Sequence, residues 1–128
     1  MSETHDPHEQ TPAIKDHPLY QLLRDGKVAE FNARRQAGET CDLTGTDFRG
    51  LDLRGLDAAG LDLSNSYFRQ ADLRGVDLST ANLAGASIHG TKISGVHFPP
   101  DLPAEEIVLS LEHGTRLRYG VPVRASKS

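Results

Sequence analysis

The sequence is poor in the residue types that build disulfide frameworks and bulky cores. It has one cysteine, Cys41, no tryptophan, and 5% aromatic residues among its 128 residues. A single cysteine excludes an intramolecular disulfide framework and fits a reducing compartment. No segment approaches the roughly 20 apolar residues of a membrane helix, and the first residues lack the basic and apolar regions of a secretory signal. These absences predict a cytoplasmic protein without a membrane partner.

Signals for nucleic-acid binding and for catalysis are also scarce. The formal net charge is -4, which does not indicate a nucleic-acid partner. Histidine and cysteine show no zinc-site spacing, and no glycine-rich loop precedes a Walker-type Lys-Ser/Thr. We therefore predict no enzyme, no cofactor and no structural metal. One open case is His5 and His8 beside Asp6 and Glu9, which could hold a metal weakly.

A five-residue repeat fills the middle of the chain. Residues 41–100 divide without insertion into twelve units, beginning CDLTG TDFRG LDLRG. The third position is apolar in all twelve, the second is Asp in seven, and the fifth is Gly in eight. A period of five fits neither an α-helix nor a β-strand. Each unit must therefore form the same short segment followed by a turn. Such units become stable by stacking on copies of themselves.

The repeat predicts which side chains form the core. Third positions point inward, and polar neighbours point outward. The expected structural core is therefore Leu43, Phe48, Leu53, Leu63, Phe68, Leu73, Leu78, Leu83, Ile88, Ile93 and Phe98. First positions should also point inward, which makes Cys41 a small core residue more readily than a reactive thiol.

The units resemble the pentapeptide-repeat family, whose signature is A(D/N)LxG. ADLRG at residues 71–75 and ANLAG at residues 81–85 come closest to it. In that family four units make one square coil, and the coils stack into a right-handed quadrilateral parallel β-helix. The resemblance implies an all-β solenoid of about three coils here. Residues four units apart agree with this, since Phe48 would lie over Phe68 and Arg49 over Arg69.

The flanking segments are expected to close the two ends of the solenoid. Residues 1–16 predict a disordered N-terminal arm, and residues 17–40 predict a helical N-terminal cap, with Asp25 as N-cap of its second helix. Residues 101–114 predict a capping helix with Ile107, Val108 and Leu111 on its apolar face. Residues 115–128 predict a solvated basic tail, with Arg116, Arg118, Arg124 and Lys127.

The outer surface is the remaining candidate for function. A regular set of charges and one tyrosine offers a possible partner-binding surface, which comprises Arg49, Arg54, Tyr67, Arg69, Arg74, Asp52 and Asp72. We expect a non-catalytic protein-interaction scaffold, monomeric or homodimeric, that presents ordered charge ladders to an unidentified protein partner.

The family resemblance implies an alternative function, because some members mimic duplex DNA and regulate DNA gyrase and topoisomerase IV in quinolone protection. Two features weigh against it here. Three coils at about 4.8 Å make a rod of about 14 Å, which spans about four base pairs. Residues 41–100 carry seven acids and five bases, so their charge is nearly balanced.

Overall fold

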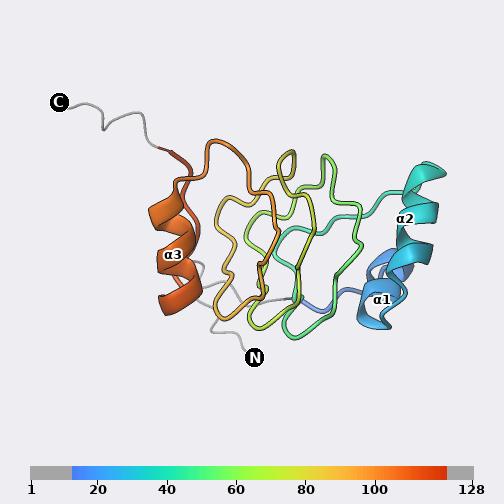
Figure 1. Cartoon of the computed structure of the whole chain (residues 1–128). Coiled ribbons are helices and arrows are strands. Elements are labelled where there is room, and N and C mark those ends of the chain that lie inside the picture. The colour runs from blue at the N-terminus through green and yellow to red at the C-terminus, as the bar shows by residue number, and fades with distance from the viewer. Residues whose placement is uncertain (1–12, 121–128) are drawn as a thin grey trace.

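The repeat segment winds into stacked coils with helices at both ends (Figure 1). The structure is a computed structural model and describes residues 13–120. Helices α1 (Pro18–Arg24) and α2 (Val28–Gln36) lie at one end, and α3 (Ala104–His113) lies at the other. Residues 1–12 of the predicted arm, with His5 and His8, and residues 121–128 of the predicted tail lie outside the described residues.

Backbone pairing between coils has a constant register of four repeat units. Parallel bridges join Asp52 to Asp72, Asp62 to Asn82 and Asp77 to His97. Hydrogen bonds follow the same register, as where the N–H of Leu53 donates to the carbonyl of Asp72 at 2.9 Å. Residues 41–100 therefore form coil 1 (41–60), coil 2 (61–80) and coil 3 (81–100), with four units in each.

The pairing falls short of the continuous strands of the predicted all-β architecture, which is therefore not confirmed. Within residues 13–120 it consists of isolated bridges, and no continuous strand forms between coils. The physical reason is the turn at every unit: the N–H of Leu56 returns to the carbonyl of Leu53, and that of Val76 to Leu73. Only a residue or two of extended backbone remains between turns, which is too short for a ladder.

In ten of the twelve units, the fifth residue has the positive φ that such a turn uses. Gly50 has φ 73° and Gly75 has φ 77°, in the left-handed region that side chains disfavour. Asn65 and Gln70 adopt the same conformation with φ 60° and 59°. A Cβ at Gly85 would also lie 2.1 Å from the Oδ1 of Asn65 in the coil before, so the Asn65 side chain would have to move to admit it.

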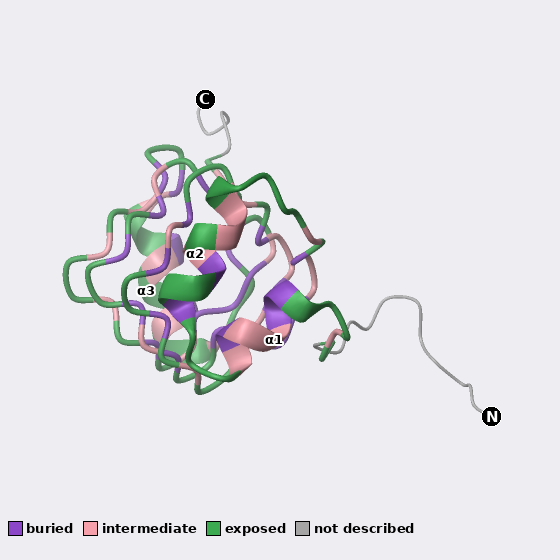
Figure 2. Ribbon diagram, turned by 90° about the vertical axis from the view of Figure 1, so that its right-hand side faces the viewer, coloured by how far each residue is buried: buried purple, intermediate pink, exposed green. Residues whose placement is uncertain are grey.

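Third-position side chains fill the interior of the coils. Figure 2 shows how buried residues recur along the ribbon of the coils. Nine of the predicted core residues are buried, namely Leu43, Phe48, Leu53, Leu63, Phe68, Leu73, Leu78, Leu83 and Ile88. Ile93 and Phe98 are only partly buried. They belong to the last two units of coil 3, where no further coil packs above them.

Helices α1 and α2 close the N-terminal end of the stack with side-chain hydrogen bonds. The hydroxyl of Tyr20 donates to the carbonyl of Asp47 at 2.5 Å. The amide of Asn32 accepts from the N–H of Asp57 and donates to the carbonyl of Gly55, both at 2.9 Å. These contacts satisfy backbone groups that would otherwise be unpaired at the edge of coil 1.

The predicted cap of the second helix is wrong. The N-cap of α2 is Lys27, which makes no side-chain cap, whereas Asp25 ends α1 and returns its N–H to Gln21. Gly26, with φ 77°, then reverses the chain. The Asp-Gly pair therefore ends one helix and does not begin the next.

The N-terminal edge also receives residues that the sequence placed in the disordered arm. Ala13 forms a parallel bridge with Thr46. The Nζ of Lys15 donates to the carbonyls of Asp42 and Thr44 at 2.9 and 2.6 Å. Residues 13–16 thus extend the pairing of coil 1, because its carbonyls offer unpaired acceptors.

At the C-terminal end, α3 and residues 115–120 together cover coil 3. The prediction of a solvated tail is wrong for the described part of that segment, since Leu117 is buried at 1% exposure. Its carbonyl accepts from Gly85 and its N–H donates to Ala86, both at 2.8 Å. Residues 115–120 therefore continue the backbone pairing of the stack by one further step.

The packed face of α3 differs from the predicted one. Its buried residues are Glu106 and Ser110, and Ile107 and Leu111 pack partly against the core. Val108 is 49% exposed and points away. Glu106 faces inward because its carboxylate accepts from the N–H of Arg118 at 3.0 Å and pairs with that residue's guanidinium.

We expect the replacement Ser110→Ala to reduce the free energy of unfolding by about 1–3 kcal/mol. The Ser110 hydroxyl is fully buried and accepts from the N–H of Ile88 at 2.9 Å. Alanine would leave that buried N–H without an acceptor. Urea unfolding followed by circular dichroism measures the change. The exposed replacement Ser94→Ala serves as control, and an equal effect of both replacements would contradict the role of Ser110.

Candidate functional site

The aspartates of the second position fix the arginines of the fourth position. In coil 1, the Oδ1 of Asp52 accepts from the N–H of Arg54 at 3.2 Å, and its carboxylate accepts from Nε and Nη2 at 2.9 and 2.7 Å. Asp72 and Arg74 in coil 2 repeat this geometry with the same distances. The Nε of Arg54 also lies 3.5 Å from the Oδ2 of Asp72, which links the two coils. We call these four residues the charge ladder.

The ion pairs of the charge ladder fix the positions of its side chains but contribute little to the stability of the fold. The side chains of Asp52 and Arg54 are 55% and 53% exposed, so water screens their attraction. Each carboxylate nevertheless accepts hydrogen bonds from a guanidinium and from a backbone N–H, both of which favour its charged form. The guanidinium of Arg54 lowers the pKa of Asp52 to about 2, and that of Arg74 lowers the pKa of Asp72 to about 2.

These shifts predict how acid affects the ladder. We expect the Cγ signal of Asp52 to titrate with a midpoint of about 2 by carbon-13 NMR, and Arg54→Gln to raise that midpoint toward the ordinary 3.8. A carboxyl group whose pKa is lower in the folded than in the unfolded protein stabilises the fold at pH values above its ordinary pKa. This stabilisation is lost as the pH falls through the pKa of the folded state. Acid destabilisation between about pH 4 and pH 2 should therefore be shallower in the variant.

The control for that titration is Arg69→Gln, which should leave Asp52 unchanged, because Arg69 belongs to another side of the coils. A midpoint of Asp52 near its ordinary value in the unaltered chain would contradict the paired geometry.

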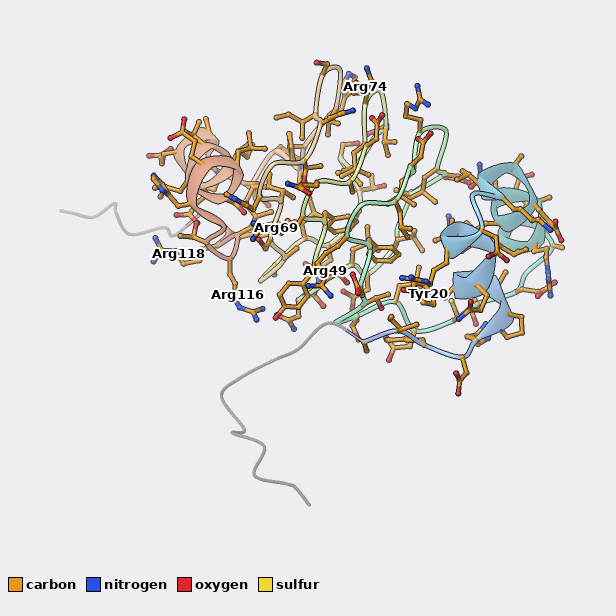
Figure 3. All side chains as sticks on the ribbon, turned by 90° about the horizontal axis from the view of Figure 1, so that it is seen from below. Tyr20, Arg49, Arg69, Arg74, Arg116 and Arg118 are labelled. Atoms are coloured by element: carbon orange, nitrogen blue, oxygen red, sulfur yellow. The ribbon has the colours of Figure 1, made fainter. Side chains whose placement is uncertain are left out.

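The other predicted surface residues gather in a separate cleft. Arg49, Tyr67 and Arg69 line a cavity of about 450 Å³, together with Ser87, His89, His113, Gly114 and Arg116. We call it the basic cleft. Figure 3 shows Arg49, Arg69 and Arg116 on one side of the stack and Arg74 on another. The predicted binding surface is therefore two surfaces, the charge ladder and the basic cleft.

Tyr67 lies in this cleft and is less exposed than the repeat pattern predicts. It is half-buried, and it bridges Asp47 and Ser87 in the neighbouring coils. The guanidinium of Arg116 lies 5.2 Å from its ring centroid and donates to its hydroxyl. Because Tyr67 is engaged with the closing segment, it supports the wall of the cleft.

Sequence reasoning missed five of the eight residues that line the basic cleft. His89 follows Arg69 by four repeat units, so the column of Arg49 and Arg69 could have identified it. His113 and Arg116 come from the end of α3 and the segment after it, which lie outside the repeat. The five-residue period therefore predicts nothing about where these two residues lie.

Cys41 lies in a smaller cavity of about 220 Å³ between the N-terminal helices and coil 1, with Leu19 and Phe31 in its lining. It is half-buried, in contrast to the fully internal position expected for it. Burial raises the pKa of the thiol, so it stays protonated at neutral pH. A protonated thiol is a poor nucleophile, which gives this cavity no evident chemistry.

The described residues offer neither a metal cluster nor a membrane segment. Among residues 13–120, no three His, Cys, Asp or Glu side chains are grouped to hold a metal ion. In the same part of the chain, none of the helices has the length and apolar character that crossing a membrane requires.

Coils that repeat one turn and one set of contacts with their neighbours define a repeat protein. The comparison with known families agrees: the chain matches pentapeptide repeats in eight copies, over residues 39–70 and 62–98. The chain is a pentapeptide-repeat protein, as the sequence motifs indicate. No curated protein and no solved structure matches it.

Proposed function

We propose that the chain is a non-catalytic protein-interaction scaffold that docks a partner protein on its charge ladder. The observation that carries this proposal is the fixed geometry of Asp52, Arg54, Asp72 and Arg74, repeated from one coil to the next. The family supports the coarser statement that the chain is a repeat-protein scaffold.

The proposal also concerns the backbone that carries the ladder. We propose that the coil stack is the right-handed quadrilateral β-helix that the family resemblance implies. The parallel bridges at a register of four repeat units support it. A rigid stack of this kind holds the ladder at a constant spacing, which a flexible loop cannot do.

Pre-ordered arginines favour binding because their ordering cost is already met in the free protein. Immobilising a long side chain at an interface costs about 0.5–1.5 kcal/mol. In the ladder, each guanidinium is already held by two hydrogen bonds to a carboxylate. Its remaining N–H groups can donate to oxygens of a partner, and the exposed carboxylate of Asp52 can accept. The complementary partner surface carries both charges at matching spacing.

The same pairing argues against catalysis by these carboxylates. A general acid or base works best with a pKa near the operating pH. The paired guanidiniums lower the pKa of Asp52 and Asp72 to about 2, so both stay ionised and hold no transferable proton near neutrality.

Capture from an extract of the cells that express the protein tests the docking surface. The bait chain is compared with a ladder variant, Arg54→Glu with Arg74→Glu, and with the control Arg34→Glu, whose guanidinium pairs with Glu39 on the N-terminal cap. We expect one protein to be retained by the chain and by the control, and to fall at least about tenfold with the ladder variant. Equal retention by all three, or no specific protein under several conditions, would contradict the proposal.

The DNA-mimic alternative stays a prediction. A mimic of duplex DNA needs a run of unpaired negative charge, whereas Asp47, Asp52 and Asp72 each pair with the arginine two residues on. We expect micromolar protein to leave supercoiling by DNA gyrase unchanged. Inhibition or protection of gyrase in that assay would favour the alternative over the scaffold.

A further inference from the structure

We propose that the basic cleft binds a phosphate-class oxyanion, such as a phosphate monoester or pyrophosphate. This inference is independent of the docking surface proposed above, because the cleft and the charge ladder share no residue. It rests on the charges that line the cavity, on how they are held, and on the room between them.

The lining of the cleft is cationic. Arg49 and Arg69 occupy the same position in successive coils, and Arg116 enters from the closing segment. His89 and His113 complete the set of basic groups, and none of the lining residues is acidic. Two carboxylates lie beside the lining: that of Asp47 pairs with Arg49 at 3.0 Å, and Oε1 of Glu112 lies 4.0 Å from Nε2 of His113. Arg69 forms no ion pair with a carboxylate of residues 13–120.

The scaffold holds these groups in place without a ligand. Arg116 donates to the carbonyl of Gly85 at 3.0 Å and lies against the Tyr67 ring. Gly114 ends α3 with φ 75°, and a Cβ there would lie 3.5 Å from the Cβ of His89. The end of α3 thus lies against His89, whose Nδ1 is buried and has no hydrogen-bond partner within residues 13–120. The cleft is assembled by three segments that the stack brings together.

The chemistry of the lining selects a multivalent oxyanion. A planar guanidinium donates two parallel N–H groups, which fits the edge of a phosphate. Several cations around one cavity attract a dianion more strongly than a single carboxylate. The volume of about 450 Å³ lies within the range of small-molecule sites and accommodates a phosphate group with part of the molecule that carries it.

Calorimetric titration of the full chain with inorganic pyrophosphate tests the site, with sodium chloride at matched ionic strength in the background. We expect saturable binding that Arg69→Gln weakens at least about tenfold, since it removes a charge-assisted contact. The matched control is Arg74→Gln, an arginine at the same repeat position on the charge ladder, which should change the affinity less than about twofold. The thermal midpoint of each variant checks that both remain folded.

A second readout and two ligand arms complete the test. Pyrophosphate should shift the NMR signals of His89 and His113 and leave those of His97, on another side of coil 3, unchanged. Inorganic phosphate and a nucleoside monophosphate are compared to distinguish a free anion from a phosphate monoester. Absence of saturable binding of all three anions, or equal weakening by Arg69→Gln and Arg74→Gln, would overturn the proposal. The ladder variant Arg54→Glu with Arg74→Glu should still bind pyrophosphate, which separates this site from the docking surface.

Discussion

Replacing Phe68 by alanine is expected to reduce the free energy of unfolding by about 3–5 kcal/mol, the cost of removing a large buried ring. Phe68 is fully buried and stacks on Phe48 with ring centroids 5.0 Å apart and planes at 10°. The edge of Tyr20 from α1 meets Phe48 at 5.8 Å. This column of three rings joins the N-terminal cap to coils 1 and 2, so a cavity at Phe68 weakens the contact between them.

Urea unfolding of Phe68→Ala and Phe98→Ala measures the effect against a matched control. Phe98 has the same repeat position but lies at the partly buried end of coil 3. Truncation of Phe98 leaves a hollow that water can reach, so the free energy of unfolding should fall by less than it does for Phe68→Ala. If Phe98→Ala destabilised the chain as much as Phe68→Ala, the buried ring column would not be the centre of the core.

Replacing Leu117 by alanine is expected to cost about 2–5 kcal/mol, although this residue lies beyond the repeat. Its side chain is 1% exposed, and its backbone pairs with Gly85 and Ala86 at the open edge of coil 3. Loss of the side chain therefore loosens the segment that supplies hydrogen bonds to that edge. The same unfolding experiment measures the change.

Leu109→Ala is the control for Leu117, because Leu109 lies on α3 and is 39% exposed. We expect it to change the free energy of unfolding by no more than about 1 kcal/mol. Similar values for the two leucines would show that residues 115–120 behave as the solvated tail that their charge suggests.

The five-residue period predicted the interior of the coils but not the ends. A third-position residue such as Leu63 is buried because coils lie on both sides of it. Ile93 has the same pattern and is only partly buried, since its neighbour in the next coil does not exist. The caps rely on single side chains such as Asn32 and Ser110, which bond backbone groups far away in sequence. No local pattern marks such residues, because their partners are set by the tertiary fold.

The candidate sites divide in the same way. The ladder of Arg54 and Arg74 could be predicted, because a register of four repeat units places one over the other. The same register places Arg69 on another side of the coil, but its cleft with His113 and Arg116 could not be predicted, since it depends on where α3 and the segment after it meet the stack. The sequence period thus predicts which residues lie over one another in a column. Which column lines a cleft depends on where α3 and residues 115–120 pack against the stack.

Proton NMR contacts between coils test the central claim, which is that side chains four repeat units apart lie against each other and hold both surfaces in register. We predict contacts between the rings of Phe48 and Phe68, between the methyl groups of Leu53 and Leu73, and between Leu117 and Ala86. Backbone contacts between coils in a register other than four units within the repeat, or no contact between Phe48 and Phe68, would contradict the stack and the ladder and cleft that depend on it.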